Sequence, residues 1–250
     1  MRRISTDVER AIEVFVHGFS FTRSFTHPYV PQRVGPLWAV RDAPRKNGRD
    51  YRREEWVAHD VPADEVDRIA GKGTRGHFAV CAMHAVGEDD APMRAAYKAL
   101  GYRLGVTEPL MTHDLSRIPR CESPATIERV RTVEMAERVA KMARARQILP
   151  EHLVDDAPIR EYVASIDGQL VGRVGSIRTV AGQWCSNMYV LPQFRRRGIG
   201  RALLCRMLRD DRAAGAKVAV LTASHTGAKL YVTVGYEQVA TLYLFTPKKR

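Results

Sequence analysis

The pattern of apolar and polar positions is clearest in the second half of the chain. Residues 161–166 and 170–177 alternate apolar with polar side chains around the turn 167-DGQ-169, which predicts a β-hairpin. A further apolar stretch, 184-WCSNMYVL-191, ends at a proline and predicts a strand. Residues 201–215 place leucines and a methionine on one helical face and finish in a glycine, which predicts a helix with a glycine cap.

Further elements flank these four. Residues 125–133 and 217–223 have the apolar character of strands, whereas 134–148 and 226–234 have helical spacing. A last strand is predicted over 238–246. Strands and helices therefore follow one another through the second half of the chain, joined by short turns.

Length and charge narrow the possibilities. The 250 residues are enough for two units of ordinary domain size. The formal net charge is +12, of which residues 1–119 carry +2 and residues 120–250 carry +10. Such an excess leaves three partners open: nucleic acid, an anionic cofactor, or only solvent around a charged surface.

The cysteines and the apolar runs indicate the cellular setting. Cys81, Cys121, Cys185 and Cys205 show no CxxC pairing, so we expect no disulfide framework. No stretch approaches the roughly 18 apolar residues of a membrane span, and the N-terminal residues do not resemble a signal peptide. We expect a cytoplasmic protein that binds no membrane. The spacing in 81-CAMH-84 lacks a second pair of ligands, so we also expect no metal.

The stretch 195-RRRGIG-200 joins the strand 184–191 to the following helix. The first N–H groups of a helix lack internal partners and attract anions, and glycine lets the backbone approach a phosphate closely. The alternative is a basic turn ahead of an ordinary helix. The loop is not a GxxxxGK[ST] motif. It is not a dinucleotide fingerprint either, because Leu203 stands where the third glycine belongs and no ribose-binding acid follows about 20 residues later.

Two blocks of sequence resemble the GNAT superfamily of acetyltransferases. The stretch 190-VLPQFRRRGIGRALL-204 is similar to its acetyl-CoA signature, with Arg195, Gly198 and Gly200 at the motif positions. The stretch 221-LTASHTGAKLYVTVGYEQV-239 resembles the next block, in which a strand ends in A-S, a short helix carries L-Y, and G-Y follows. The resemblance implies an α/β (α+β) fold with a mixed, mostly antiparallel sheet flanked by helices.

The resemblance also implies acetyl-CoA as the co-substrate. In that family the two central strands, here 184–191 and 217–223, splay apart and admit the pantetheine arm. The cofactor-binding residues implied by position are Met188, Tyr189, Val190, Arg195, Arg196, Arg197, Gly198, Ile199, Gly200, Arg201 and Ser224. Many relatives have a cofactor-contacting asparagine where this chain has Ser224 and His225, which is a departure from the family pattern.

Tyr231 aligns with the tyrosine that often acts as general acid toward the departing thiolate in this family. Its alternative is a core aromatic residue beside Leu230 and Val234. The strand before the glycine loop lacks the glutamate that many relatives use as general base. A water relay or Glu161 could substitute, although we expect Glu161 to be an exposed charge at a strand end. We assign Cys185 no role, because a cysteine on an apolar strand usually packs.

The first half resembles the second. The stretch 95-AAYKALGYRLGVTEPLM-111 aligns without a gap with 229-KLYVTVGYEQVATLYLF-245, which predicts two tandem GNAT-like units. In the first half, 61-VPADEVDRIAGK-72 opens with acids where the phosphate loop should lie, and their charge would repel a pyrophosphate. We therefore expect residues 1–119 to form a degenerate, non-catalytic unit and residues 120–250 to form the acetyl-CoA-binding N-acetyltransferase.

The expected activity is acetyl transfer from acetyl-CoA to a primary amine. The alternatives are a non-catalytic module that senses acyl-CoA and, last, a basic protein that binds nucleic acid. The acceptor is a small-molecule or peptide amine that the sequence does not identify. The oligomeric state stays open between a monomer and a homodimer.

Overall fold

The computed structural model describes residues 2–46, 48 and 51–248, and the chain divides into two units. The first unit comprises Met1–Met111, Thr222–His225 and Gln238–Arg250, and the second comprises Thr112–Leu221 and Thr226–Glu237. The last segment of the chain therefore belongs to the first unit. Among the helices described, none is both long enough and apolar enough to cross a membrane.

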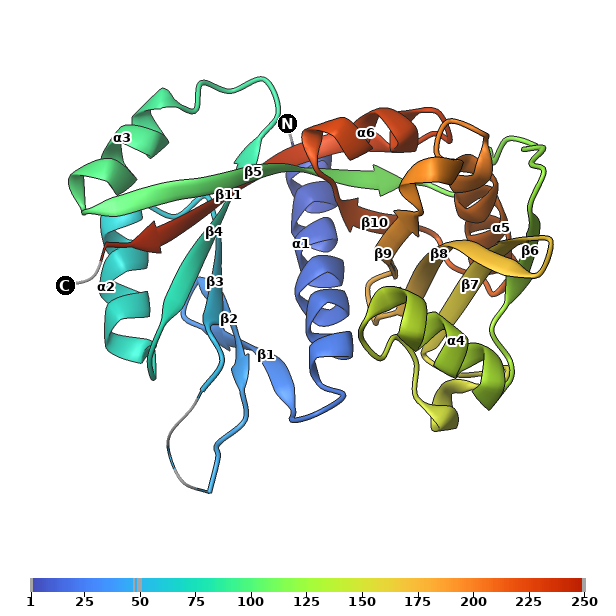
Figure 1. Cartoon of the computed structure of the whole chain (residues 1–250). Coiled ribbons are helices and arrows are strands. Elements are labelled where there is room, and N and C mark those ends of the chain that lie inside the picture. The colour runs from blue at the N-terminus through green and yellow to red at the C-terminus, as the bar shows by residue number, and fades with distance from the viewer. Residues whose placement is uncertain (1, 47, 49–50, 249–250) are drawn as a thin grey trace. The chain divides into compact units, whose positions relative to one another are not determined.

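In the first unit, helices pack on a mixed sheet (Figure 1). Its helices are α1 (Arg2–Arg23), α2 (Ala63–Gly73) and α3 (Ala91–Ala99). Its strands, in spatial order, are β1 (Tyr29–Val34), β2 (Leu37–Asp42), β3 (Glu54–His59), β4 (Phe78–Ala85), β11 (Glu237–Pro247) and β5 (Tyr102–His113). Strand β11 comes from the end of the chain, and it runs antiparallel to β4 from Ala240↔Ala85 to Phe245↔Val80.

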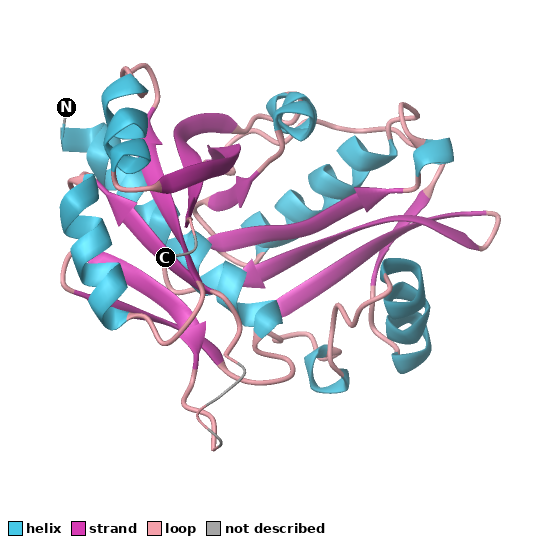
Figure 2. Ribbon diagram, turned by 60° about the vertical axis from the view of Figure 1, so that its left-hand side comes forward, coloured by secondary structure: helices cyan, strands magenta, loops and turns pink. Residues whose placement is uncertain are grey.

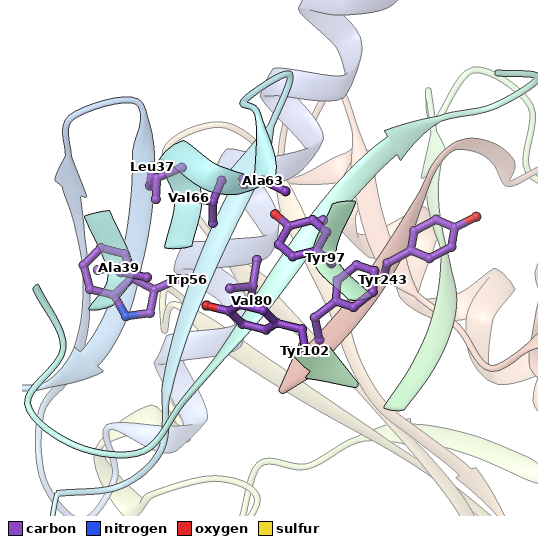
Figure 3. Packing of buried hydrophobic residues seen from close by; sticks show 13 residues of the cluster. Leu37, Ala39, Trp56, Ala63, Val66, Val80, Tyr97, Tyr102 and Tyr243 are labelled. Carbon is purple, nitrogen blue, oxygen red and sulfur yellow. The ribbon is translucent and has the colours of Figure 1, made fainter. Parts of the chain in front are cut away.

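Aromatic side chains fill the core of the first unit (Figure 3). Tyr97 on α3 stacks on Phe245 of β11, with ring centroids 4.3 Å apart, so the last strand supplies part of this core. Trp56 on β3 lies against α2, where a Cβ at Gly73 would come within 2.6 Å of the Trp56 Cη2 atom. Glycine is required at that position because any side chain would collide with the indole ring.

The second unit contains the remaining strands of the chain, with helices packed beside them (Figure 2). Its strands, in spatial order, are β10 (Ala219–Thr222), β9 (Gln183–Val190), β8 (Gln169–Arg178), β7 (Ile159–Ile166) and β6 (Thr126–Arg129). Its helical elements are α4 (Val133–Ala143), α5 (Ile199–Ala213) and α6 (His225–Val232), with the short 3-10 helices η1 (Pro150–His152) and η2 (Pro192–Phe194). The predicted hairpin is confirmed as β7 and β8, which pair antiparallel.

Two element boundaries differ from the expectation. The helix predicted over 134–148 ends at Ala143, because Arg144 adopts a left-handed conformation with φ 54° and the Ala145 N–H returns to the Ala140 carbonyl at 3.1 Å. The strand predicted over 125–133 is limited to Thr126–Arg129. The glycine cap of α5 is confirmed, since Gly215 has φ +86° and donates its N–H to the Arg212 carbonyl at 2.9 Å.

A disulfide joins Cys121, which precedes β6, to Cys205 on α5, with Cα atoms 6.5 Å apart. The expectation of no disulfide was wrong for this pair, because the two cysteines are 84 residues apart and only the fold brings them together. The other two, Cys81 and Cys185, are free and buried.

Candidate active site

The strands β9 and β10 diverge soon after they meet. They pair in parallel at Gln183↔Ala219 and Trp184↔Val220, and no further pair forms between them in the part of the chain described. The divergence expected for these strands is confirmed. In the first unit, by contrast, β3 pairs in parallel with β4 along the whole length of β3, from Glu54↔Phe78 to His59↔Met83.

Strand β9 bends where it leaves β10. Its register with β8 slips between Gly175↔Ser186 and Arg173↔Tyr189, which is a β-bulge. Asn187 lies in the bulge with φ 54°, and its side-chain amide donates to the Gln147 Oε1 atom at 3.0 Å. The predicted cofactor residues Met188, Tyr189 and Val190 follow directly. On the side that β10 has left, their backbone forms a strand edge that an extended ligand could pair with.

The predicted glycine loop lies at the start of α5. The first helical hydrogen bond runs from the Ala202 N–H to the Gly198 carbonyl, at 3.0 Å, so the N–H groups of Ile199, Gly200 and Arg201 have no helical partner. Arg196 and Gly198 have φ values of +65° and +78°, which turn the loop into the helix. The helix N-terminus with its free N–H groups is suited to a pyrophosphate.

The two glycines of the loop leave no room for side chains. A Cβ at Gly200 would come within 2.9 Å of Met188 Cε on β9 and within 3.1 Å of Leu230 Cδ2 on α6. A Cβ at Gly198 would lie 3.1 Å from the Glu122 carbonyl oxygen. The loop, the end of β9 and α6 therefore close together around Gly200, and the residues present fit a phosphate group bound through backbone N–H donors.

The arginines of the loop take two kinds of position. Arg195 donates through Nε to the Val190 carbonyl at 3.0 Å, and its guanidinium lies 5.9 Å from the Tyr189 ring centroid, so it ties the loop to β9. Arg196, Arg197 and Arg201 are exposed, and Arg197 lies 5.7 Å from the Phe194 ring centroid. Their charges add to the positive end of α5.

Tyr231 on α6 is 8% exposed, and its ring meets the ring of Tyr236 edge-on at 5.7 Å. Burial, with a smaller contribution from Cys185, raises the pKa of the Tyr231 hydroxyl, which therefore keeps its proton at neutral pH. Ser224 is placed differently from the other predicted residues. It is exposed and belongs to the segment Thr222–His225 of the first unit.

The sequence pattern did not indicate the position of Glu161. This residue lies on the interior strand β7 and is 1% exposed, so the expectation of an exposed strand-end charge was wrong. Arg173 Nη1 donates to Glu161 Oε1 at 3.2 Å and to Gln147 Oε1 at 2.7 Å. Burial raises the pKa of Glu161 to about 7, against the opposing effect of Arg173. The hairpin register contained a signal, because it places Glu161 and Arg173 diagonally on one face.

Among the described residues, no three His, Cys, Asp or Glu side chains come together in a way that could hold a metal ion. Charged and polar side chains lie near β9 in the glycine loop and in the buried group of Glu161, Arg173 and Gln147.

A parallel strand pair that opens beside a glycine loop, with a helix N-terminus at the open end, offers a site for an extended ligand that carries an anionic group. Residues 158–238 match the family model described as acetyltransferase (GNAT) domain. This part of the chain is therefore similar to GNAT acetyltransferase domains, as the resemblance predicted. Among curated proteins, none matches the sequence.

Solved structures of acetyltransferases share the fold. A GCN5-related N-acetyltransferase from Kribbella flavida is 16% identical, with 96% of each chain covered and a TM-score of 0.67. One from Sphaerobacter thermophilus is 19% identical over 84% of this chain and 76% of the other, with a TM-score of 0.57. A tandem GNAT protein from the clavulanic acid biosynthesis pathway is 14% identical over 87% and 82%, with a TM-score of 0.53. The mixed sheet and the tandem arrangement predicted from the sequence are thus confirmed.

Proposed function

We propose that the second unit transfers an acetyl group from acetyl-CoA to a primary amine, with Tyr231 as the general acid. The observation that carries this proposal is the glycine loop, with free N–H groups at the start of α5, beside the diverging strands β9 and β10. The pyrophosphate binds the N–H groups of Ile199, Gly200 and Arg201, and Arg196 and Arg197 add charge.

The pantetheine arm then runs along the free edge of β9 at Met188, Tyr189 and Val190, which directs the thioester toward the point of divergence. The amine nitrogen attacks the thioester carbonyl carbon, and the carbon–sulfur bond breaks. Tyr231 donates its proton to the departing thiolate. Burial keeps the Tyr231 phenol protonated at neutral pH, which is the form that a proton donor needs.

The first unit does not catalyse in this proposal, and residues 1–119 support the transferase formed by residues 120–250. Two features support the assignment. Strands β3 and β4 are paired throughout, so no arm can pass between them, and the α2 segment begins with Asp64 and Glu65 where the second unit has arginines. A pyrophosphate would be repelled there.

Calorimetric titration of acetyl-CoA into the wild type and Gly198→Glu tests the cofactor site. A glutamate at Gly198 brings negative charge to the pyrophosphate site, and we expect saturable binding to be lost. Gly198→Gln is the matched control, because it places a side chain of the same size at the same left-handed position beside the Glu122 carbonyl, without the charge. Absence of binding by the wild type would refute the proposal. Equal loss in both variants would assign the effect to the added side chain and not to its charge.

A sensor that binds acyl-CoA without turnover is the competing function. Release of free CoA thiol in the presence of a panel of primary amines separates the two, because a sensor binds acetyl-CoA in the calorimeter and releases no thiol with any amine.

A further inference from the structure

The two faces of the second sheet carry different buried groups. Arg160 on β7 and Ser176 on β8 both donate to the Asp211 carboxylate of α5, at 2.6 and 2.7 Å, so their side chains point to the face that α5 covers. Because successive side chains of a strand alternate, Glu161 and Gly175 point to the opposite face. Ser186 pairs with Gly175 across β8 and β9 and shares that opposite face.

On this opposite face, the polar side chains of Glu161 and Ser186 converge around Gly175. A Cβ there would lie 2.8 Å from Glu161 Oε2 and 2.8 Å from Ser186 Oγ, so only glycine leaves room for both. Ser186 is 9% exposed and Arg173 is 8% exposed. Among the described residues, Ser186 Oγ and Arg173 Nε have no hydrogen-bond partner.

Buried polar atoms without partners are costly, at about 1–3 kcal/mol each. Two of them beside a buried carboxylate therefore indicate a site for polar atoms of a ligand. Ser186 also lies on β9 where this strand separates from β10. It follows the last pair with β10, at Trp184, and precedes the bulge and the predicted pantetheine-binding edge at Met188.

The neighbouring residue on β9 faces the other way. Cys185 pairs with Ser176 on the α5 face, and it contributes to the raised pKa values of Tyr231 and Tyr236. The proposed acid, Tyr231, therefore approaches β9 from the face opposite to Glu161 and Ser186. An acetyl group at the point of divergence would have a proton donor on one face and a proton acceptor on the other.

We propose that Ser186 and Glu161 bind the acceptor amine and remove its proton. This rests on the proposed acetyl transfer. The ammonium nitrogen donates hydrogen bonds to Ser186 Oγ and to Glu161 Oε2, and one of its protons passes to the Glu161 carboxylate. The freed nitrogen lone pair then attacks the acetyl carbonyl, the carbon–sulfur bond breaks, and the thiolate takes the Tyr231 proton. The nitrogen loses its second proton, which passes through water to the Tyr231 phenolate. The acceptor is thus a primary amine that arrives in its ammonium form.

The groups around Glu161 suit this role. Arg173 on β8 faces its carboxylate, and the segment after α4 contributes the uncharged Gln147 amide through Arg173. The resulting pKa of about 7 lets the Glu161 carboxylate take up and release a proton near neutrality.

Glu161→Gln tests the proposal, and Asp211→Asn is its matched control. Asp211 is an equally buried acid whose pKa is raised to about 6, but it lies on the α5 face. Acetyl transfer to propylamine, which is protonated at neutral pH, is compared with transfer to hydroxylamine, which is not. We expect Glu161→Gln to lower transfer to propylamine about 100-fold and transfer to hydroxylamine by less than about threefold. Asp211→Asn should change both nucleophiles equally. An equal loss with both nucleophiles in Glu161→Gln would overturn the proposal.

A second measurement does not depend on transfer. Infrared spectroscopy follows the ionisation of the Glu161 carboxyl as a function of pH. Its signal is the difference between the spectra of the wild type and of Glu161→Gln, recorded with and without propylamine. A bound ammonium should lower the midpoint by about one pH unit or more, since an opposite charge nearby favours the carboxylate. The effect should disappear in Ser186→Ala. An unchanged midpoint would overturn the amine site, whereas a shifted midpoint in a protein that fails to bind acetyl-CoA would refute only the proposed function.

Discussion

The ring of Tyr231 meets the ring of Tyr236 edge-on, with centroids 5.7 Å apart and an interplanar angle of 72°. Tyr97 and Tyr102 repeat this arrangement in the first unit, at 5.5 Å and 78°. In each pair, a glycine with positive φ precedes the second tyrosine, at Gly235 and at Gly101. The gapless sequence match between 95–111 and 229–245 thus corresponds to the same helix, glycine and strand arrangement, built twice. Only the second copy lies beside a glycine loop in its own unit.

Tyr231→Phe should lower kcat for acetyl transfer about 100-fold and leave the Kd for acetyl-CoA unchanged, because the phenol acts on the thiolate and the cofactor is held elsewhere. Tyr97→Phe is the matched control, since Tyr97 has the same ring contact in the first unit. Steady-state kinetics and calorimetry check the two quantities. A similar loss of kcat in both variants would assign Tyr231 to packing.

The chain should bind one acetyl-CoA. Strands β3 and β4 pair over six positions, whereas β9 and β10 pair over two, so only the second unit offers an opening for the arm. The stoichiometry of the calorimetric titration measures this directly. Two sites per chain would contradict the assignment of the first unit as non-catalytic support.

Glu161 should make stability depend on pH. Its pKa rises on folding from 4.5 to about 7, so the folded state holds the proton more tightly than the unfolded state. The free energy of unfolding should therefore fall as pH rises from below about 4.5 through 7, by about 3 kcal/mol at most, and should then level off. Urea unfolding at pH 5 and pH 8 measures the difference.

In Glu161→Gln the same comparison should show a smaller fall. A part of the fall should remain, because the pKa of Asp211 is raised as well, from 3.8 to about 6. Identical pH dependence in the variant and the wild type would contradict the buried, titrating Glu161.

Reduction should destabilise the second unit. The Cys121–Cys205 disulfide closes a segment with a sequence separation of 84, and opening it should lower the free energy of unfolding by about 4 kcal/mol. Thiol titration of the denatured protein should find two free thiols before reduction, from Cys81 and Cys185, and four after it. Four thiols without reduction would show that the disulfide does not form. Cys81→Ala, in the first unit, should retain the stabilisation by the disulfide.

The sequence by itself determined the features that depend on neighbouring residues. The hairpin of β7 and β8, the glycine loop at Gly198 and Gly200, and the helix that follows were all predicted, because turn residues, strand alternation and helical spacing act over a few positions. The tandem arrangement was predicted in the same way, from a repeat that can be aligned by eye.

Tertiary structure decided the features that depend on distant segments. The sequence pattern around Glu161 is that of an ordinary strand end. The Glu161 side chain is buried because β7 lies between β6 and β8, and Arg173 contacts its carboxylate. The disulfide between Cys121 and Cys205 forms because the segment before β6 packs on α5. Strand β11, from the end of the chain, joined β4 within the first unit, because backbone hydrogen bonds between strands are satisfied by any edge that the fold brings within reach.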